Sequence, residues 1–193
     1  MHNCIILAAG ESERMGELKP FLMFDKELTF LEYLIMTYID FGVETPLVVV
    51  NEKVLKRIRN EDNVFFRKCQ LILNQYPVKG RFYSVALGLN ECIKSSSVFI
   101  QNVDNPFIGS ELLEKMADSL SGFDFVVPQY NGKTGHPVLI SSKLAGQLLK
   151  RYHETSVLND VLKSFKRHEI QVADPKVLAN VNTPKEYQNY FGG

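Results

Sequence analysis

The chain contains no tryptophan, few cysteines and no excess charge of either sign. Cys4, Cys69 and Cys92 are odd in number, lie in apolar segments and include no CxxC pair. They therefore predict reduced, buried thiols rather than disulfides or a metal site. The 22 basic residues balance 22 acidic residues, so no general electrostatic field would attract nucleic acid or an anionic membrane. We expect a small ligand.

Long apolar runs are also missing. Spanning a bilayer takes roughly 20 consecutive apolar residues, and the first residues enter a strand-like run at once instead of showing a secretory signal. These absences predict a cytoplasmic protein with no membrane partner. With 193 residues and 45% apolar content, the chain suits one domain, residues 1–193, with a full core. The sequence leaves the oligomeric state open.

Short apolar runs alternate along the chain with segments of helical periodicity. The β-branched run 47–50 is typical of a strand buried on both faces of a parallel sheet, and the turn-rich residues 129–135 predict a hairpin-like connection. This rhythm predicts an α/β fold with three layers (α/β/α) and a mostly parallel sheet. Strands are expected at 4–7, 47–50, 69–73, 98–103, 123–128, 137–140 and 170–172, and helices at 29–42, 52–59, 82–93, 110–120, 144–150, 157–165 and from 184 onward.

The residues after the first strand, 7–20, suit a triphosphate. Small side chains let a ligand approach backbone N–H groups, which can form an anion-binding concavity. Arg14 adds a donor fork and Lys19 a compact charge. The stretch has neither the P-loop pattern nor GxGxxG, and a surface loop that happens to contain Arg and Lys is the alternative. The expected phosphate-binding residues are Leu7, Ala8, Ala9, Gly10, Arg14 and Lys19.

Two later segments carry further candidates. Gly80 lies in a turn that opens a helix, where free N–H groups suit a polar ring edge or an anion. Ser84 follows it and could instead cap that helix. Asp104 comes at the end of a strand, the edge where open α/β sheets collect ligands. A lone carboxylate there suits Mg²⁺ bound mainly through water and phosphates, and a turn or helix cap is its alternative role.

A group of cations occurs late in the chain. Arg151, Lys163, Lys166 and Arg167 cluster near the helix expected at 157–165. A solvated helix face explains this charge better than a phosphate-binding patch does.

The pattern LAAGxSxRMGxxK at residues 7–19 resembles the signature of MobA-like NTP transferases, which are nucleotidyltransferases with a glycosyltransferase-A-like, Rossmann-like fold. Residues 77–89 are similar to the segment by which this family, and the cytidylyltransferases of isoprenoid synthesis, approach the nucleobase. The family's DxP, GHPVL and NVNTP segments are matched at 104–106, 135–139 and 180–184. The matches run from residue 7 to 187 and imply a mixed sheet with one antiparallel strand.

The resemblance also implies roles for individual residues. Gly80 and Ser84 would lie near the nucleobase, and Asp104 would bind Mg²⁺ together with Asn182. Lys19 and Arg14 would be catalytic. His136 would bind the acceptor or shape its loop. A general-base role for it is not needed, because a phosphate oxygen is already anionic at pH 7.

The implied reaction is attack of an acceptor's phosphate oxygen on the α-phosphorus of an NTP, with release of pyrophosphate. The GHPVL segment favours a molybdopterin cytidylyltransferase and hence CTP. The NVNTP segment favours the guanylyltransferase instead, and Lys19-Pro20 is commoner in sugar-phosphate enzymes. We expect a Mg²⁺-dependent, molybdenum cofactor cytidylyltransferase-like enzyme with a small phosphorylated acceptor. The alternatives are a sugar- or polyol-phosphate nucleotidyltransferase and a non-catalytic nucleotide-binding regulatory protein, against which the retained Arg14, Lys19 and Asp104 argue.

Overall fold

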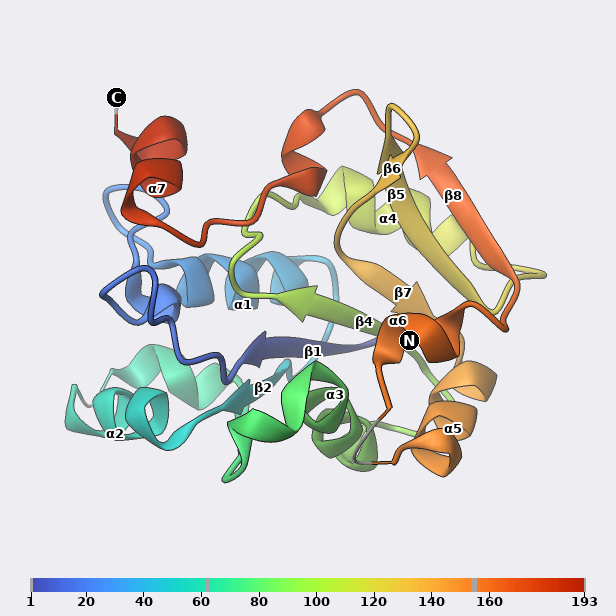
Figure 1. The fold of residues 1–193 in the computed structure, drawn as a ribbon, viewed down its shortest axis with the longest axis horizontal. Helices are drawn as coiled ribbons and strands as arrows, with labels where there is room; N and C mark the ends of the chain where they lie inside the picture. Colours follow the sequence, from blue (N-terminus) through green and yellow to red (C-terminus); the bar gives the residue numbers. More distant parts are fainter. Residues whose placement is uncertain (1, 62, 154–155, 193) are drawn as a thin grey trace.

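A single eight-stranded mixed sheet organises the chain in the computed structural model, which describes residues 2–61, 63–153 and 156–192 (Figure 1). The strand order is β3-β2-β1-β4-β7-β5-β6, and β8 pairs with β5. β6 and β7 run against the other strands, so the sheet is mixed and mostly parallel, as predicted. The strands are β1 (His2–Ala8), β2 (Leu47–Val50), β3 (Gln70–Leu73), β4 (Ser97–Asn102), β5 (Phe125–Tyr130), β6 (Lys133–Thr134), β7 (Val138–Ile140) and β8 (Arg167–Gln171).

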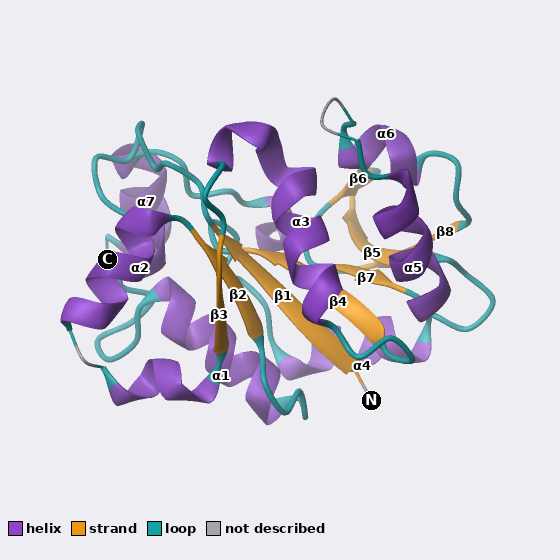
Figure 2. Ribbon diagram, turned by 90° about the horizontal axis from the view of Figure 1, so that it is seen from below, coloured by secondary structure: helices purple, strands orange, loops and turns teal. Residues whose placement is uncertain are grey.

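Helices cover both faces of this sheet (Figure 2). The core on one face includes side chains of α1, α2 and α4, and the core on the other includes those of α3, α5 and α6. The predicted three-layer α/β/α architecture is therefore confirmed. The helices are α1 (Phe30–Asp40), α2 (Glu52–Asn60), α3 (Gly80–Glu91), α4 (Ser110–Asp118), α5 (Ser142–Arg151), α6 (Leu158–Leu162) and α7 (Pro184–Phe191), with short 3-10 turns η1 (Lys19–Phe21), η2 (Val64–Lys68), η3 (Pro77–Lys79) and η4 (Pro175–Leu178).

Several element boundaries and the strand count differ from the sequence expectations. α3 begins at Gly80 because η3 leads directly into it. α6 ends at Leu162, earlier than expected. β8 covers 167–171 because it pairs residue by residue with 125–129 of β5. The two-residue β6 forms a hairpin with β5, so two strands are antiparallel where one was expected.

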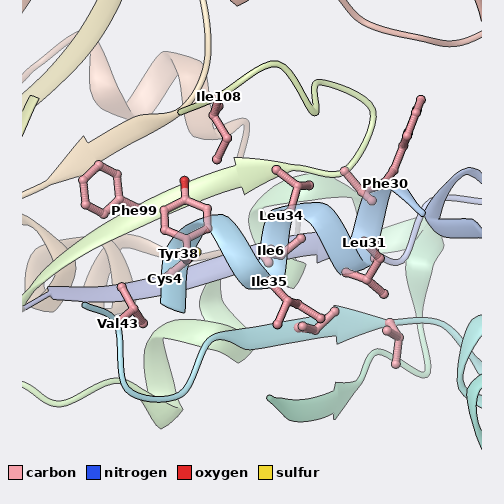
Figure 3. Packing of buried hydrophobic residues seen from close by; sticks show 14 of the residues in the cluster. Cys4, Ile6, Phe30, Leu31, Leu34, Ile35, Tyr38, Val43, Phe99 and Ile108 are labelled. Carbon is pink, nitrogen blue, oxygen red and sulfur yellow. The ribbon is translucent and has the colours of Figure 1, made fainter. Parts of the chain in front are cut away.

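Alternation along β1 divides the core between the two faces. Cys4 and Ile6 contact the apolar side of α1, where Leu34 and Tyr38 are fully buried (Figure 3), whereas Ile5 faces the opposite core. This period of two is the geometry of a strand. Each such buried aliphatic side chain contributes about 1.5–3 kcal/mol relative to exposure.

The three cysteines are free, as expected. Cys4 is buried and burial raises its pKa, whereas Cys69 and Cys92 are only half-buried, which corrects the expectation that all three are buried. Burial raises the pKa of both Cys69 and Cys92 to about 12, so these thiols are protonated at neutral pH.

The topology brings several chain segments to one edge of the sheet. The carboxyl ends of the parallel strands β1, β2 and β4 lie there. Because β7 is antiparallel to β4, the amino end of β7 lies at the same edge. α7 packs beside the segment after η1, where Tyr187 Oη donates to the carbonyl of Met23 at 2.9 Å and Phe191 contacts Phe24 (Figure 1). In the described parts of the chain, no helix is both long and apolar enough to cross a bilayer.

Candidate active site

A cavity of about 280 Å³ opens at this edge, between the loop after β1 and the start of α3. All of the expected nucleotide-binding residues except Arg14 line it. These are Leu7, Ala8, Ala9, Gly10, Lys19, Gly80, Ser84 and Asp104. The cavity wall also includes Ser12, Arg81 and Asn102, which the sequence did not single out.

The loop after β1 is held in place by side chains on both sides. Asn51, at the end of β2, donates from Nδ2 to the carbonyls of Ala9 and Gly10, each at 3.2 Å. Ser12 adopts a left-handed φ of 56°, and its Oγ accepts from the backbone N–H of Lys19 at 3.2 Å. In the described structure no acceptor is paired with the N–H groups of Gly10 or Ser12. They remain free to donate to an anion, as an anion-binding concavity requires.

Lys19 lines the cavity and joins three segments that are distant in the sequence. Its Nζ donates to Oδ2 of Asp104 at 3.2 Å and to Oδ1 of Asn182 at 2.5 Å. The side chains of Lys19 and Asp104 are only 13% and 20% exposed, so this ion pair is less screened than a surface pair. The two oxygens that were expected to bind a cation therefore converge on the same cationic group.

Backbone contacts fix the two oxygen donors relative to one another. The N–H of Val181 donates to the carbonyl of Asp104 at 2.7 Å. Asn105, beside Asp104, donates from Nδ2 to the carbonyls of Lys176, Val177 and Ala179. Residues 176–181, which precede α7, are thus hydrogen-bonded to the loop after β4.

The capping alternative for Asp104 is wrong. α4 begins at Ser110 with Gly109 as its N-cap, and the carboxylate of Asp104 contacts Lys19 instead. The N-cap of α7 is Thr183, whose hydroxyl accepts from the N–H of Glu186 at 3.3 Å. The side chain of Asn182 is therefore not needed to cap that helix.

The donor set at Asp104 and Asn182 fits a hard divalent cation. One carboxylate and one amide oxygen already converge on an ammonium group. Such a set leaves most coordination positions to water and phosphate, as Mg²⁺ prefers. No cluster of three or more His, Cys, Asp or Glu side chains that could hold a metal occurs among the described residues.

The start of α3 forms the opposite wall of the cavity. Gly80 has a φ of 83°, which favours glycine. Ser84 is buried, and its Oγ accepts from Nδ2 of Asn74 at 2.9 Å. Its hydroxyl hydrogen remains available as a donor. The N-cap of α3 is Lys79, so the capping alternative for Ser84 is wrong.

Arg14 lies apart from this cavity. It is exposed and does not line the cavity wall. Its charge acts on Glu186, whose pKa is lowered first by the hydrogen bond from the N–H of Asn182, with smaller effects of Thr183 and Arg14. The structure thus places Arg14 next to the start of α7, near the segment that carries Asn182.

His136 lies beside the cavity without lining it. Its Nε2 is 2.9 Å from Nδ2 of Asn102, and its backbone N–H donates to the carbonyl of Val177 at 3.0 Å. Burial lowers the pKa of His136 to about 4. The positive charge of Arg81 also lowers this pKa, and the negative charge of Asp104 raises it. The ring is neutral at pH 7. Its contacts shape the 134–136 segment, and it also lines a second cavity.

Some of the missed residues had a signal in the sequence. Asn102 lies near the end of the strand predicted at 98–103, an end that was already assigned to the ligand edge. Arg81 lies inside the segment matched at 77–89. Asn51 follows the second strand directly and had no recognisable pattern beyond its position.

Comparison with protein families gives a match over most of the chain. The sequence model described as "MobA-like NTP transferase domain" matches residues 4–171. The chain is 25% identical to the molybdenum cofactor cytidylyltransferase of Escherichia coli K12, over 96% of this chain and 93% of that protein. It is also 25% identical to a "Probable molybdenum cofactor guanylyltransferase" of Methanosarcina mazei, over 98% of this chain and 90% of that protein.

Solved structures share the fold at lower identity. Rv0371c of Mycobacterium tuberculosis superposes with a TM-score of 0.84 at 18% identity, covering 100% of this chain and 97% of that chain. A manganese complex of Rv0371c superposes with a TM-score of 0.81 at 17% identity, covering 100% and 98%. At these identities the similarity shows the fold alone.

Proposed function

Because the chain belongs to the MobA-like NTP transferase family, and is thus a nucleotidyltransferase, we propose that it transfers CMP from CTP to the phosphate of a small, molybdopterin-like acceptor and releases pyrophosphate. One observation carries this proposal. Lys19 and Asp104 line one cavity together with a loop that has free backbone N–H groups, and Asn182, which does not line that cavity, contacts the same ammonium group of Lys19. Free N–H donors together with a cation site are the groups that hold a triphosphate.

The chain's own residues act by position and charge. The N–H groups of Gly10 and Ser12 hold phosphate oxygens, and Lys19 stabilises the negative charge that develops during transfer. Holding both substrates at one edge aligns the attacking and leaving oxygens. No general base is required, since the attacking phosphate oxygen is already anionic. Arg14 reaches the outer phosphates from its exposed position beside α7.

Asp104 and Asn182 are the proposed ligands of a Mg²⁺ ion. When bound, the ion neutralises the crowded phosphate oxygens and orients the triphosphate. The manganese complex of Rv0371c supports a divalent metal on this fold. The retained Lys19 and Asp104 argue against a protein that only binds nucleotide, because a non-catalytic copy could lose either residue.

The base and the acceptor are the finer parts of the proposal. Gly80 and Ser84 line the cavity where a base edge would contact them. Named relatives include a cytidylyltransferase and a guanylyltransferase of the molybdenum cofactor, which supports a pterin acceptor more than a sugar phosphate. The GHPVL segment at 135–139 supports CTP.

The test is pyrophosphate release with each of CTP, GTP, ATP and UTP, in Mg²⁺, with molybdopterin and a panel of sugar and polyol phosphates. We expect the highest kcat/KM for CTP with molybdopterin. A preference for GTP would replace cytidylyl by guanylyl transfer. Faster reaction with a sugar phosphate would overturn the proposed acceptor, and nucleotide binding without release in any combination would favour a regulatory protein.

A further inference from the structure

A second cavity, of about 550 Å³, lies next to the first one. It is formed by β5, β7, α6 and residues 134–136. Arg81 lines both cavities, and the contact between Asn102 and His136 connects their walls. A molecule in the second cavity would therefore reach the edge at which the nucleotide cavity opens.

The charges that line the second cavity have one sign. Arg81, Lys163 and Arg167 are part of its wall, and no carboxylate is among the described residues that line it. The other polar lining side chains are those of Thr134, His136 and Asn159. This composition favours an anionic occupant.

Arg81 is exposed and lines both cavities. Within the described structure it has no hydrogen-bond or ion-pair partner. An unpaired guanidinium offers its donor fork to a phosphate at no cost in broken contacts. Arg81 and His136 line the same cavity, and the charge of Arg81 helps to lower the pKa of His136. Nδ1 of His136 is shielded from solvent and also has no partner.

Lys163 and Arg167 are paired with acids outside the cavity wall, of which Asp160 is exposed and Glu169 is half-buried. Lys163 Nζ lies 2.7 Å from Asp160, with side chains 77% and 63% exposed, and Arg167 lies 2.5 Å from Glu169. An exposed pair such as Lys163–Asp160 contributes about 0–1 kcal/mol, and in the other pair the side chain of Arg167 is 51% exposed. An anionic ligand can therefore approach both cations. A solvated helix face accounts for Lys163 alone, but not for its sharing one cavity with Arg81 and Arg167.

We propose that the second cavity binds the acceptor, that Arg81 contacts the acceptor phosphate that attacks the nucleotide, and that Lys163 and Arg167 recognise a second acidic group of the same molecule. This inference rests on the proposed function for the attack, but the binding of a doubly acidic molecule can be tested without it. The ligand class is a small phosphomonoester with a second anionic group.

The binding test compares glycerol 3-phosphate with 3-phosphoglycerate, which adds a carboxylate, in NMR titrations of the ¹⁵N-labelled protein. We expect shifts of the amides at 134–136 and 159–167, and at least fivefold tighter binding of 3-phosphoglycerate. The double variant Lys163→Ala/Arg167→Ala should lose that preference, and Lys143→Ala, at an exposed position of α5, should keep it. Equal affinities, or shifts confined to 8–12 and 104, would overturn the proposal.

The kinetic test uses the acceptor that supports pyrophosphate release. Arg81→Ala should raise the KM for the acceptor at least tenfold and change the KM for NTP less than twofold, and Arg81→Lys should recover part of the loss. A rise confined to the KM for NTP would assign Arg81 to the nucleotide. If no acceptor supports release, the proposed function fails, and the titration with 3-phosphoglycerate still decides whether this cavity binds anions.

Discussion

Lys19 Nζ lies 2.5 Å from Oδ1 of Asn182, which follows it by 163 positions in the chain. The same ammonium group contacts Asp104. The loop after β1, the loop after β4 and the segment before α7 are therefore joined through one side chain. A change at any of the three residues alters the hydrogen bonding or the electrostatic environment of the other two.

Replacing Lys19 with Ala should lower kcat by at least about tenfold, equivalent to about 1.4 kcal/mol of lost transition-state stabilisation. The reason is that, among the described residues, Lys19 is the cation that is paired with Asp104 in this cavity. Steady-state pyrophosphate release measures the change, and circular dichroism checks the fold. Lys26→Ala, at an exposed position of the following turn, is the control. An unchanged kcat in Lys19→Ala would remove Lys19 from the proposed mechanism.

Asp104→Asn should abolish activity, because it removes the one carboxylate of the proposed Mg²⁺ site. Asn182→Ala should act more weakly and raise the Mg²⁺ concentration needed for half-maximal rate. Both are read from Mg²⁺ titrations at saturating NTP. If the requirement stays flat in Asn182→Ala while Asp104→Asn is inactive, the metal rests on Asp104, water and phosphate. Full activity of Asp104→Asn would refute the metal site itself.

The free energy of unfolding should decrease as the pH falls, because His136 becomes protonated. Its pKa is about 4 when folded, against an ordinary value of 6.5, so the unfolded chain binds more protons between these pH values. The contribution of His136 to the free energy of unfolding is therefore fully present above about pH 6.5. As the pH falls to about 4, the protein loses about 3 kcal/mol of this contribution.

Urea unfolding of the wild type and of His136→Gln over that pH range checks this expectation. The variant should show a smaller slope of unfolding free energy against pH, since glutamine does not titrate. His153→Gln, at an exposed position, serves as the control. Equal slopes in the wild type and in His136→Gln would show that the ring is already protonated or solvated in the folded protein.

Gly88→Ala should destabilise the fold by about 1–2 kcal/mol. A Cβ at Gly88 would lie 2.6–2.9 Å from side-chain atoms of Ile5, which is fully buried. Overpacking costs about 1–3 kcal/mol, and the better helix propensity of alanine returns up to about 1 kcal/mol. Gly146→Ala in α5, where a Cβ meets nothing, should be neutral or stabilising. A gain in urea midpoint for Gly88→Ala would show that Ile5 can move.

Much of the fold could be predicted because its signals are local. The apolar run before Leu7 and the β-branched run 47–50 are typical of buried strands. The helix expected from residue 29 has a local start signal, because Thr29 is the N-cap of α1 and Glu32 completes a capping box. The loop of small residues after β1 was recognisable from its composition. These features depend on neighbours within a few positions.

The remaining features depend on contacts between distant segments. The start of β8 at Arg167 is set by its register with Phe125, which no local pattern contains. The position of His136 beside Asn102 follows from the antiparallel direction of β7. The separation of Arg14 from the cavity is likewise a matter of the path of residues 13–18, which the motif does not specify.

The contact between Lys19 and Asn182 has a consequence for chains that are truncated after the sheet. β8 ends at Gln171, so a released chain that stops between Gln171 and Asn182 still contains every strand of the described sheet. In such a chain Lys19 would lack one of its two oxygen partners.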